Sequence, residues 1–167
     1  MHEGPAAAIV DAVRTRPILV AALVGTAVAA GLALAFRLVR RREPLFHLAL
    51  ADEWEQAQAD GGPYRRSTLG VSLDEQGFIH CARPGQVQQV ADDFYAGRDD
   101  VVLLVVDPRR LTAEVKVEPV PGGQRFPHVY GPLDLDAVMG TVPVTRGPDG
   151  RLDVWGSVRG SNIRFHR

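Results

Sequence analysis

Three histidines lie inside or beside short apolar segments of this 167-residue chain: His47, His80 and His128. Burying an imidazole costs free energy unless its nitrogens find partners, so each of these side chains is either hydrogen-bonded within the fold or used for chemistry. The structural role is the more common one for any single histidine. Three in comparable settings favour a shared site, because strand ends in a small sheet can converge on one cleft.

The sequence around these histidines does not match the common metal or nucleophile motifs. There is no His-x-x-x-His or Cys-x-x-Cys pair, so zinc ligands would have to come singly from distant segments. Cys81 directly follows His80, and neighbouring residues of a strand point to opposite faces, so His80 cannot readily deprotonate it. We therefore interpret Cys81 as a buried packing residue. A metal-dependent hydrolase is one class of function to test, and this hypothesis predicts stoichiometric zinc in the purified protein.

Short strands and helices must position these side chains. The apolar and alternating patterns predict strands over 45–50, 77–81, 101–106, 115–120, 128–130 and 140–144, with helices over 52–59 and from Pro84 to Gly97. Residues 101–106 form an uninterrupted apolar run, which predicts a central strand buried on both faces. Residues 64–76 lack periodicity and are predicted as a loop with a turn of helix. From Thr145 the composition changes to Gly, Arg, Asp and Ser, so we predict a loosely attached tail over 145–167, with local docking of Trp155 and Phe165.

The N-terminal region carries twenty uncharged residues, from Pro17 to Phe36. This length matches the hydrocarbon core of a bilayer, so we predict a flank over 1–16, a transmembrane helix over 17–39 and a basic linker over 40–44. Two arginines precede the uncharged run and four follow it, which predicts a single-pass protein with a cytoplasmic C-terminal domain. A cleaved signal peptide is the alternative, because Ala33-Leu34-Ala35 matches the A-x-A pattern.

The lipid bilayer is thus one expected partner, through residues 17–39. Gly25, Ala29 and Gly31 could let two such helices approach closely in a homodimer, although alanine-rich spans contain this spacing by chance. The formal net charge of −1 predicts no nucleic-acid partner. The length fits one globular domain over 45–144, and a lone cysteine cannot form an intramolecular disulfide.

Several segments of this domain, taken in order, form a distinctive pattern. They are FHLA at 46–49, GFIHC at 77–81, FYAG at 94–97, VEPV at 117–120 and FPHVYGPL at 126–133. The pattern resembles the bacterial family catalogued as domain of unknown function 952, over about residues 45–144. The resemblance implies an α+β fold similar to that of ADP-ribosyltransferases, with a small, split, mainly antiparallel sheet around a cleft and flanking helices.

The same resemblance implies roles for individual residues. In enzymes of that wider fold a polar residue of the first strand contacts the nicotinamide-side ribose of NAD, a later aromatic residue or histidine packs against nicotinamide, and a late glutamate supports its departure. Carried over, His47 is the ribose contact and His80 lies near the nicotinamide. His128 and Tyr130 occupy the late region, and Glu118 is the best carboxylate candidate.

These roles lead to two competing hypotheses of function. The first is a membrane-tethered cytoplasmic domain that binds NAD or a related small nucleotide in a histidine-lined cleft and transfers ADP-ribose or a phosphate. Arg65 and Arg83, with Arg66, would clamp the pyrophosphate or phosphate, because guanidinium groups pair with such oxygens. The alternative is a non-catalytic ligand-binding or interaction module that keeps the cleft without the enzymatic activity.

Overall fold

The structure is a computed structural model and describes residues 43–163. The predicted flank over 1–16, the predicted transmembrane helix over 17–39, the first three residues of the basic linker and Phe165 all lie outside the described residues. No helix within 43–163 is long and apolar enough to cross a membrane.

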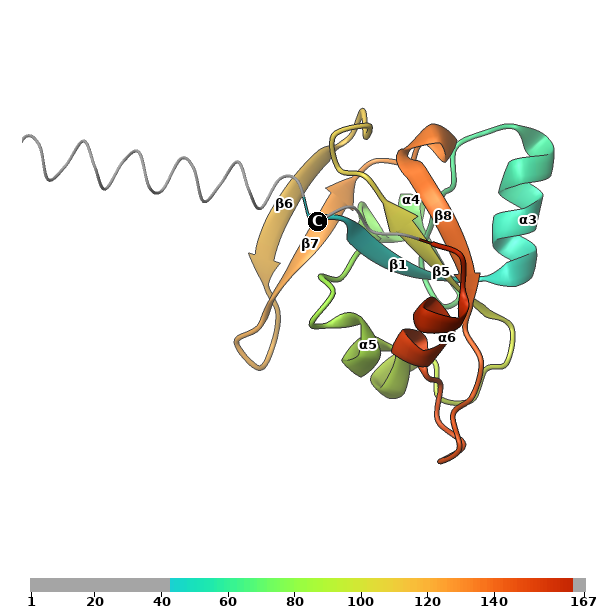
Figure 1. Cartoon of the computed structure of the whole chain (residues 1–167). Coiled ribbons are helices and arrows are strands. Elements are labelled where there is room, and N and C mark those ends of the chain that lie inside the picture. Colours follow the sequence, from blue (N-terminus) through green and yellow to red (C-terminus); the bar gives the residue numbers. More distant parts are fainter. Residues whose placement is uncertain (1–42, 164–167) are drawn as a thin grey trace, which may run out of the picture. The chain divides into compact units, whose positions relative to one another are not determined.

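The described domain is α+β and contains two three-stranded antiparallel sheets (Figure 1). The first has the order β1-β5-β8, and the second has the order β4-β7-β6. A two-stranded ribbon, β2-β3, completes the strands. Their bounds are β1 Leu45–Leu50, β2 Arg66–Thr68, β3 Val71–Ser72, β4 Ile79–His80, β5 Val101–Val106, β6 Glu114–Pro119, β7 Arg125–Tyr130 and β8 Val138–Pro143.

The helices are short and cover the sheets. They are α3 (Ala51–Asp60), α4 (Leu73–Gln76), α5 (Val87–Phe94) and α6 (Val154–Gly160), with a 3-10 turn η1 at Leu135–Ala137. α3 ends at Gly61, whose φ of 64° is the left-handed conformation that glycine adopts at little cost. α4 begins with a capping box, in which the Ser72 side chain accepts from the Glu75 N–H and the Glu75 side chain accepts from the Ser72 N–H.

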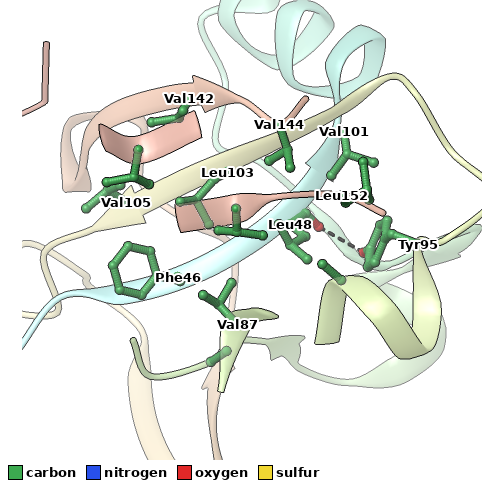
Figure 2. Close-up of a cluster of buried hydrophobic side chains, with 14 residues drawn as sticks. Phe46, Leu48, Val87, Tyr95, Val101, Leu103, Val105, Val142, Val144 and Leu152 are labelled. Carbon is green, nitrogen blue, oxygen red and sulfur yellow. Dashed lines mark hydrogen bonds between the residues drawn. The ribbon is translucent and has the colours of Figure 1, made fainter. Parts of the chain in front are cut away.

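Strand β5 lies between β1 and β8, and all six of its residues are buried. Its odd-numbered residues Val101, Leu103 and Val105 belong to one hydrophobic cluster, shown in Figure 2. Its even-numbered residues belong to a second cluster, which also contains Trp54 and Tyr64. The prediction of a central strand buried on both faces is confirmed, because period-two alternation sends neighbouring side chains to opposite faces of the sheet.

The two sheets meet where β1 passes the residues that follow β4. The Phe46 N–H donates to the Ala82 carbonyl at 2.9 Å, and the Ala82 N–H donates to the Phe46 carbonyl at 2.7 Å. This isolated pair is the backbone bridge between β1 and the segment after β4. It brings the segment that carries His47 beside the segment that carries His80.

Two of the sequence predictions need correction. Residues 64–76 contain the strands β2 and β3 as well as the helical turn α4, because strands of two or three residues are too short to show a period. The loosely attached tail over 145–167 is wrong for residues 152–158. Leu152, Val154 and Val158 are buried in the first cluster. The predicted docking of Trp155 is confirmed, because its ring meets Phe46 edge to face at 5.8 Å between ring centroids.

Gln88 of α5 makes two hydrogen bonds to the C-terminal segment. The Gln88 amide donates to the Leu152 carbonyl at 2.7 Å and accepts from the Val154 N–H at 3.0 Å. The apolar residues of this segment are separated by polar and glycine residues, so its composition resembles that of a tail although its side chains complete the core.

We predict that Leu152→Ala lowers the free energy of unfolding by about 2–5 kcal/mol, because it leaves a cavity among packed side chains. Urea unfolding of the 167-residue chain measures the change. Leu69→Ala is the matched control, since Leu69 is 37% exposed, and it should change stability by less than about 0.5 kcal/mol. Equal losses in the two variants would contradict the packing of this segment.

Candidate functional site

One face of the β4-β7-β6 sheet gathers most of the residues that the sequence singles out. Alternation along β7 puts Phe126, His128 and Tyr130 on the same face. Across the sheet, His128 lies opposite His80 of β4 and opposite Lys116 of β6. Histidines that are 48 positions apart in the sequence are therefore direct cross-strand neighbours, with their rings perpendicular and their centroids 5.2 Å apart.

A carboxylate completes this face. Glu118 Oε2 accepts hydrogen bonds from His128 Nδ1 and from the Tyr130 hydroxyl, both at 2.8 Å. These two bonds, that from His128 first, hold the pKa of Glu118 below its usual value, and the same carboxylate raises the pKa of Tyr130. The structure thus joins three predicted site residues into one network with an ionised, partly exposed carboxylate.

His80 extends this network toward the neighbouring ribbon. The Ser67 hydroxyl donates to the Phe78 carbonyl at 2.6 Å, so the contact of 3.1 Å between Ser67 Oγ and His80 Nδ1 has the imidazole N–H as its donor. His80 Nε2 then keeps its lone pair. Burial and the proximity of His128 lower the pKa of His80, so the ring is a neutral hydrogen-bond acceptor at neutral pH.

Two residues of this cluster, Phe78 and Ser67, were not predicted as site residues from the sequence. The Phe78 ring stacks on His128, with centroids 4.2 Å apart and planes 19° apart. Ser67 is fully buried beneath His80. Phe78 belongs to the GFIHC segment, whereas Ser67 lies in a stretch predicted as loop, and only the fold brings it to His80.

His47 makes a structural contact in the fold, and its predicted contact with a ribose stays a prediction. Its Nδ1 donates to the His80 carbonyl at 2.7 Å, which ties β1 to β4 through a side chain. Its ring lies edge-on to Tyr64, with centroids 5.4 Å apart, and burial lowers its pKa to about 4. Within the described chain, the buried Nε2 atoms of His47 and His128 make no hydrogen bond.

A cavity of about 520 Å³ opens beside this junction. Its floor comes from β1 and β4, one wall from α5, and another from β7 and the turn between β6 and β7. His47 and His80 line it, together with Ser67, Thr68 and mainly apolar residues, whereas His128, Glu118 and Tyr130 do not. His80 is therefore the one histidine that belongs to both the cavity and the Glu118 network among residues 43–163.

The predicted phosphate clamp does not gather at this cavity. Arg65 pairs with Asp74 at 2.6 Å, Arg83 pairs with Glu43 at 2.9 Å, and neither lines the cavity. Arg66 reaches Glu53 at 3.4 Å. Each of these guanidinium groups is engaged by a carboxylate elsewhere on the surface.

Metal and thiol chemistry find little support in the part of the chain that is described. Residues 43–163 contain no group of three or more His, Cys, Asp or Glu side chains arranged to hold a metal ion. Burial raises the pKa of the Cys81 thiol to about 12, so it is protonated at neutral pH and is a poor nucleophile. Its interpretation as a buried packing residue is confirmed.

The fold and the site define a small α+β domain with a histidine-lined cavity between two antiparallel sheets. Residues 48–141 match the family described as protein of unknown function DUF952, and the chain belongs to this family. No curated protein matches the sequence significantly.

Solved structures of one bacterial protein, CC0527 from Caulobacter crescentus, are similar to this chain. Its crystal structure shares 29% identity, covers 70% of this chain and 98% of that protein, and has a TM-score of 0.60. A methionine double variant of the same protein gives 28% identity, the same coverage and a TM-score of 0.60. Its solution NMR structure gives 32% identity, 68% and 93% coverage, and a TM-score of 0.55.

We predict that His47 makes the stability of the domain dependent on pH. Its folded-state pKa of about 4 lies below the ordinary 6.5, so between these values the unfolded chain binds a proton that the folded chain does not. Stability is therefore greatest above pH 6.5 and falls as the pH drops toward 4, by up to about 3 kcal/mol.

His47→Asn is the variant that isolates this effect, because its amide can still donate to the His80 carbonyl but does not titrate. Urea unfolding at a series of pH values between 4 and 7.5 should give a shallower pH dependence for the variant than for the wild type. The same slope in both proteins would show that His47 does not titrate as the fold predicts.

Proposed function

We propose that this domain binds NAD or a related nucleotide, with the nicotinamide and its ribose at the cavity between the two sheets. One observation carries the proposal: His80 lines a cavity of about 520 Å³ and also contacts the network that holds Glu118 ionised. Pockets of roughly 300–1,000 Å³ with apolar walls and a few placed polar groups are typical of small-molecule sites.

The topology supports the ADP-ribosyltransferase-like fold that the family resemblance implies. Two small antiparallel sheets are joined by a single backbone bridge, and the cavity lies beside this junction. A split sheet of this kind leaves a cleft where the two sheets diverge. We expect a protein of that fold to bind its ligand in this cleft.

Each group at the site has a different role in the proposed binding of NAD. The apolar walls provide surface for a flat aromatic ring, and the lone pair on His80 Nε2 can accept a hydrogen bond from a ribose hydroxyl. His47 acts through β4, because its bond to the His80 carbonyl fixes the backbone that presents His80. Cleaving the bond between ribose and nicotinamide develops positive charge on the sugar, and Glu118 is the ionised carboxylate nearest in the network.

A membrane tether is part of the proposal and rests on the sequence. The twenty uncharged residues from Pro17 to Phe36 would anchor the chain through residues 17–39, and the excess of arginine after the span would keep the domain in the cytoplasm. The domain would then act on a nucleotide at the inner membrane surface.

We expect NAD to bind the purified 167-residue chain in a calorimetric titration, and His80→Ala to weaken binding by about tenfold, the value of one lost hydrogen bond. Arg65→Ala is the control, because Arg65 pairs with Asp74 outside the cavity, and it should leave the affinity unchanged. A folded wild-type protein that does not bind NAD would refute the proposal.

The second candidate is a non-catalytic binding module, and two observations favour it. Both hydrogen bonds to Glu118 Oε2 come from the protein itself, and Glu118 does not line the cavity. Arg65 and Arg83 are also engaged away from the cavity, so the pyrophosphate lacks the predicted clamp.

Nicotinamide release separates the two candidates. If the domain is a transferase or glycohydrolase, we expect the wild type to release nicotinamide from NAD and Glu118→Gln to slow this release by about 10²–10³-fold while NAD still binds, because only the transition state needs the charge. Chromatographic detection of free nicotinamide measures the rate. Binding without release in the wild type would establish the non-catalytic module.

A further inference from the structure

The described residues that line the cavity carry one negative charge and no positive charge. Among the described residues its walls contain one carboxylate, Asp93 of α5, and no lysine or arginine. Three basic residues are next to lining positions in sequence: Arg66, Arg83 and Arg125. Arg66 reaches Glu53, Arg83 pairs with Glu43, and Arg125 donates to the Val117 carbonyl, so each is engaged elsewhere. A phosphate inside this cavity would therefore find no cation.

Asp93 lies where a carboxylate does not help its own helix. It is in the last turn of α5, whose C-terminal end carries partial negative charge, so an acidic residue there weakens the helix slightly. Its neighbour Asp92 pairs with Arg151. The Asp93 carboxylate makes no hydrogen bond or ion pair with any other residue of 43–163, and Asp93 is exposed at the cavity. Its charge is thus unused within the described domain.

Aromatic rings accompany this carboxylate. Phe94, which follows Asp93, is 63% exposed although it is a large apolar side chain, and it lines the same cavity. Phe46, Tyr95 and Phe126 also line it. A positively charged ring is stabilised both by aromatic faces and by a nearby carboxylate, whereas a neutral ring gains from the aromatic faces alone.

We propose that the cavity selects a positively charged aromatic ring, the N-substituted pyridinium of oxidised nicotinamide, and that Asp93 supplies this selectivity while the phosphates of the ligand stay outside. The proposal rests on the proposed function and deepens it, because it names which end of the nucleotide enters and in which redox state. Phe94 provides stacking surface at the cavity for both forms of the ring, and its face adds to the preference for the charged form that Asp93 sets.

The oxidised and reduced forms of one dinucleotide test this directly, because NAD and NADH differ at the ring in charge and share the same phosphates. We expect calorimetry to show that the wild-type chain binds NAD about three to ten times more tightly than NADH, the effect of one partly solvated charge pair. High salt should reduce this ratio. Asp93→Asn should bring the ratio close to one without lowering the melting temperature.

Two further variants control the experiment. Glu55→Gln removes a charge from the exposed face of α3, away from the cavity, and should leave the ratio unchanged. Phe94→Ala should weaken the binding of both ligands and leave NAD the tighter of the two, because Asp93 is still present. A ratio near one in the wild type, or a ratio that survives Asp93→Asn, would overturn the inference and leave NAD binding itself intact.

A smaller pair of probes covers the case in which neither dinucleotide binds. 1-Methylnicotinamide carries the positive ring without ribose or phosphate, and nicotinamide is its neutral counterpart. Preferred binding of 1-methylnicotinamide that depends on Asp93 would sustain the charge selectivity and refute the nucleotide as ligand. No binding of any of the four compounds would overturn both the inference and the proposed function.

Discussion

The hydrogen bond from His47 Nδ1 to the His80 carbonyl is the interaction on which the site depends. Strand β4 is only two residues long and pairs with β7 on one side. On its other side, this side-chain bond and the bridge between Phe46 and Ala82 tie it to β1. The buried, neutral imidazole thus links the two sheets where a longer strand would use backbone pairing, and it does so at the edge of the cavity.

This link places His80 between two environments with opposite properties. On one side lies a largely apolar cavity with a single carboxylate, Asp93, and on the other lies the hydrogen-bonded pair of Glu118 and His128. Because His80 Nδ1–H donates to Ser67 Oγ, Nε2 of His80 remains a hydrogen-bond acceptor. A neutral hydrogen-bond acceptor between an apolar cavity and an ionised carboxylate could accept from a ribose hydroxyl, which is why NAD is the ligand that we propose.

Membership of the DUF952 family and similarity to CC0527 place these features in a family context without assigning an activity. The match to the family covers residues 48–141, and the similar structures extend over about 70% of this chain. The segment around α6 lies beyond the family match, yet Leu152 and Val154 complete the first hydrophobic cluster. In this protein the core is therefore closed by residues outside the region that defines the family.

Local patterns in the sequence were enough to predict the buried central strand. Neighbouring side chains of a strand point to opposite faces, so a strand of six consecutive apolar residues has to be covered on both. They also singled out His80 and His128, and the family resemblance added Tyr130 and Glu118; the structure reveals the contacts among these residues. The tertiary structure alone decided that Ser67 supports His80, that Arg65 and Arg83 are paired away from the cavity, and that residues 152–158 belong to the core. These features depend on which segments meet in the fold. A partner that lies elsewhere in the chain leaves no trace in the sequence around a side chain.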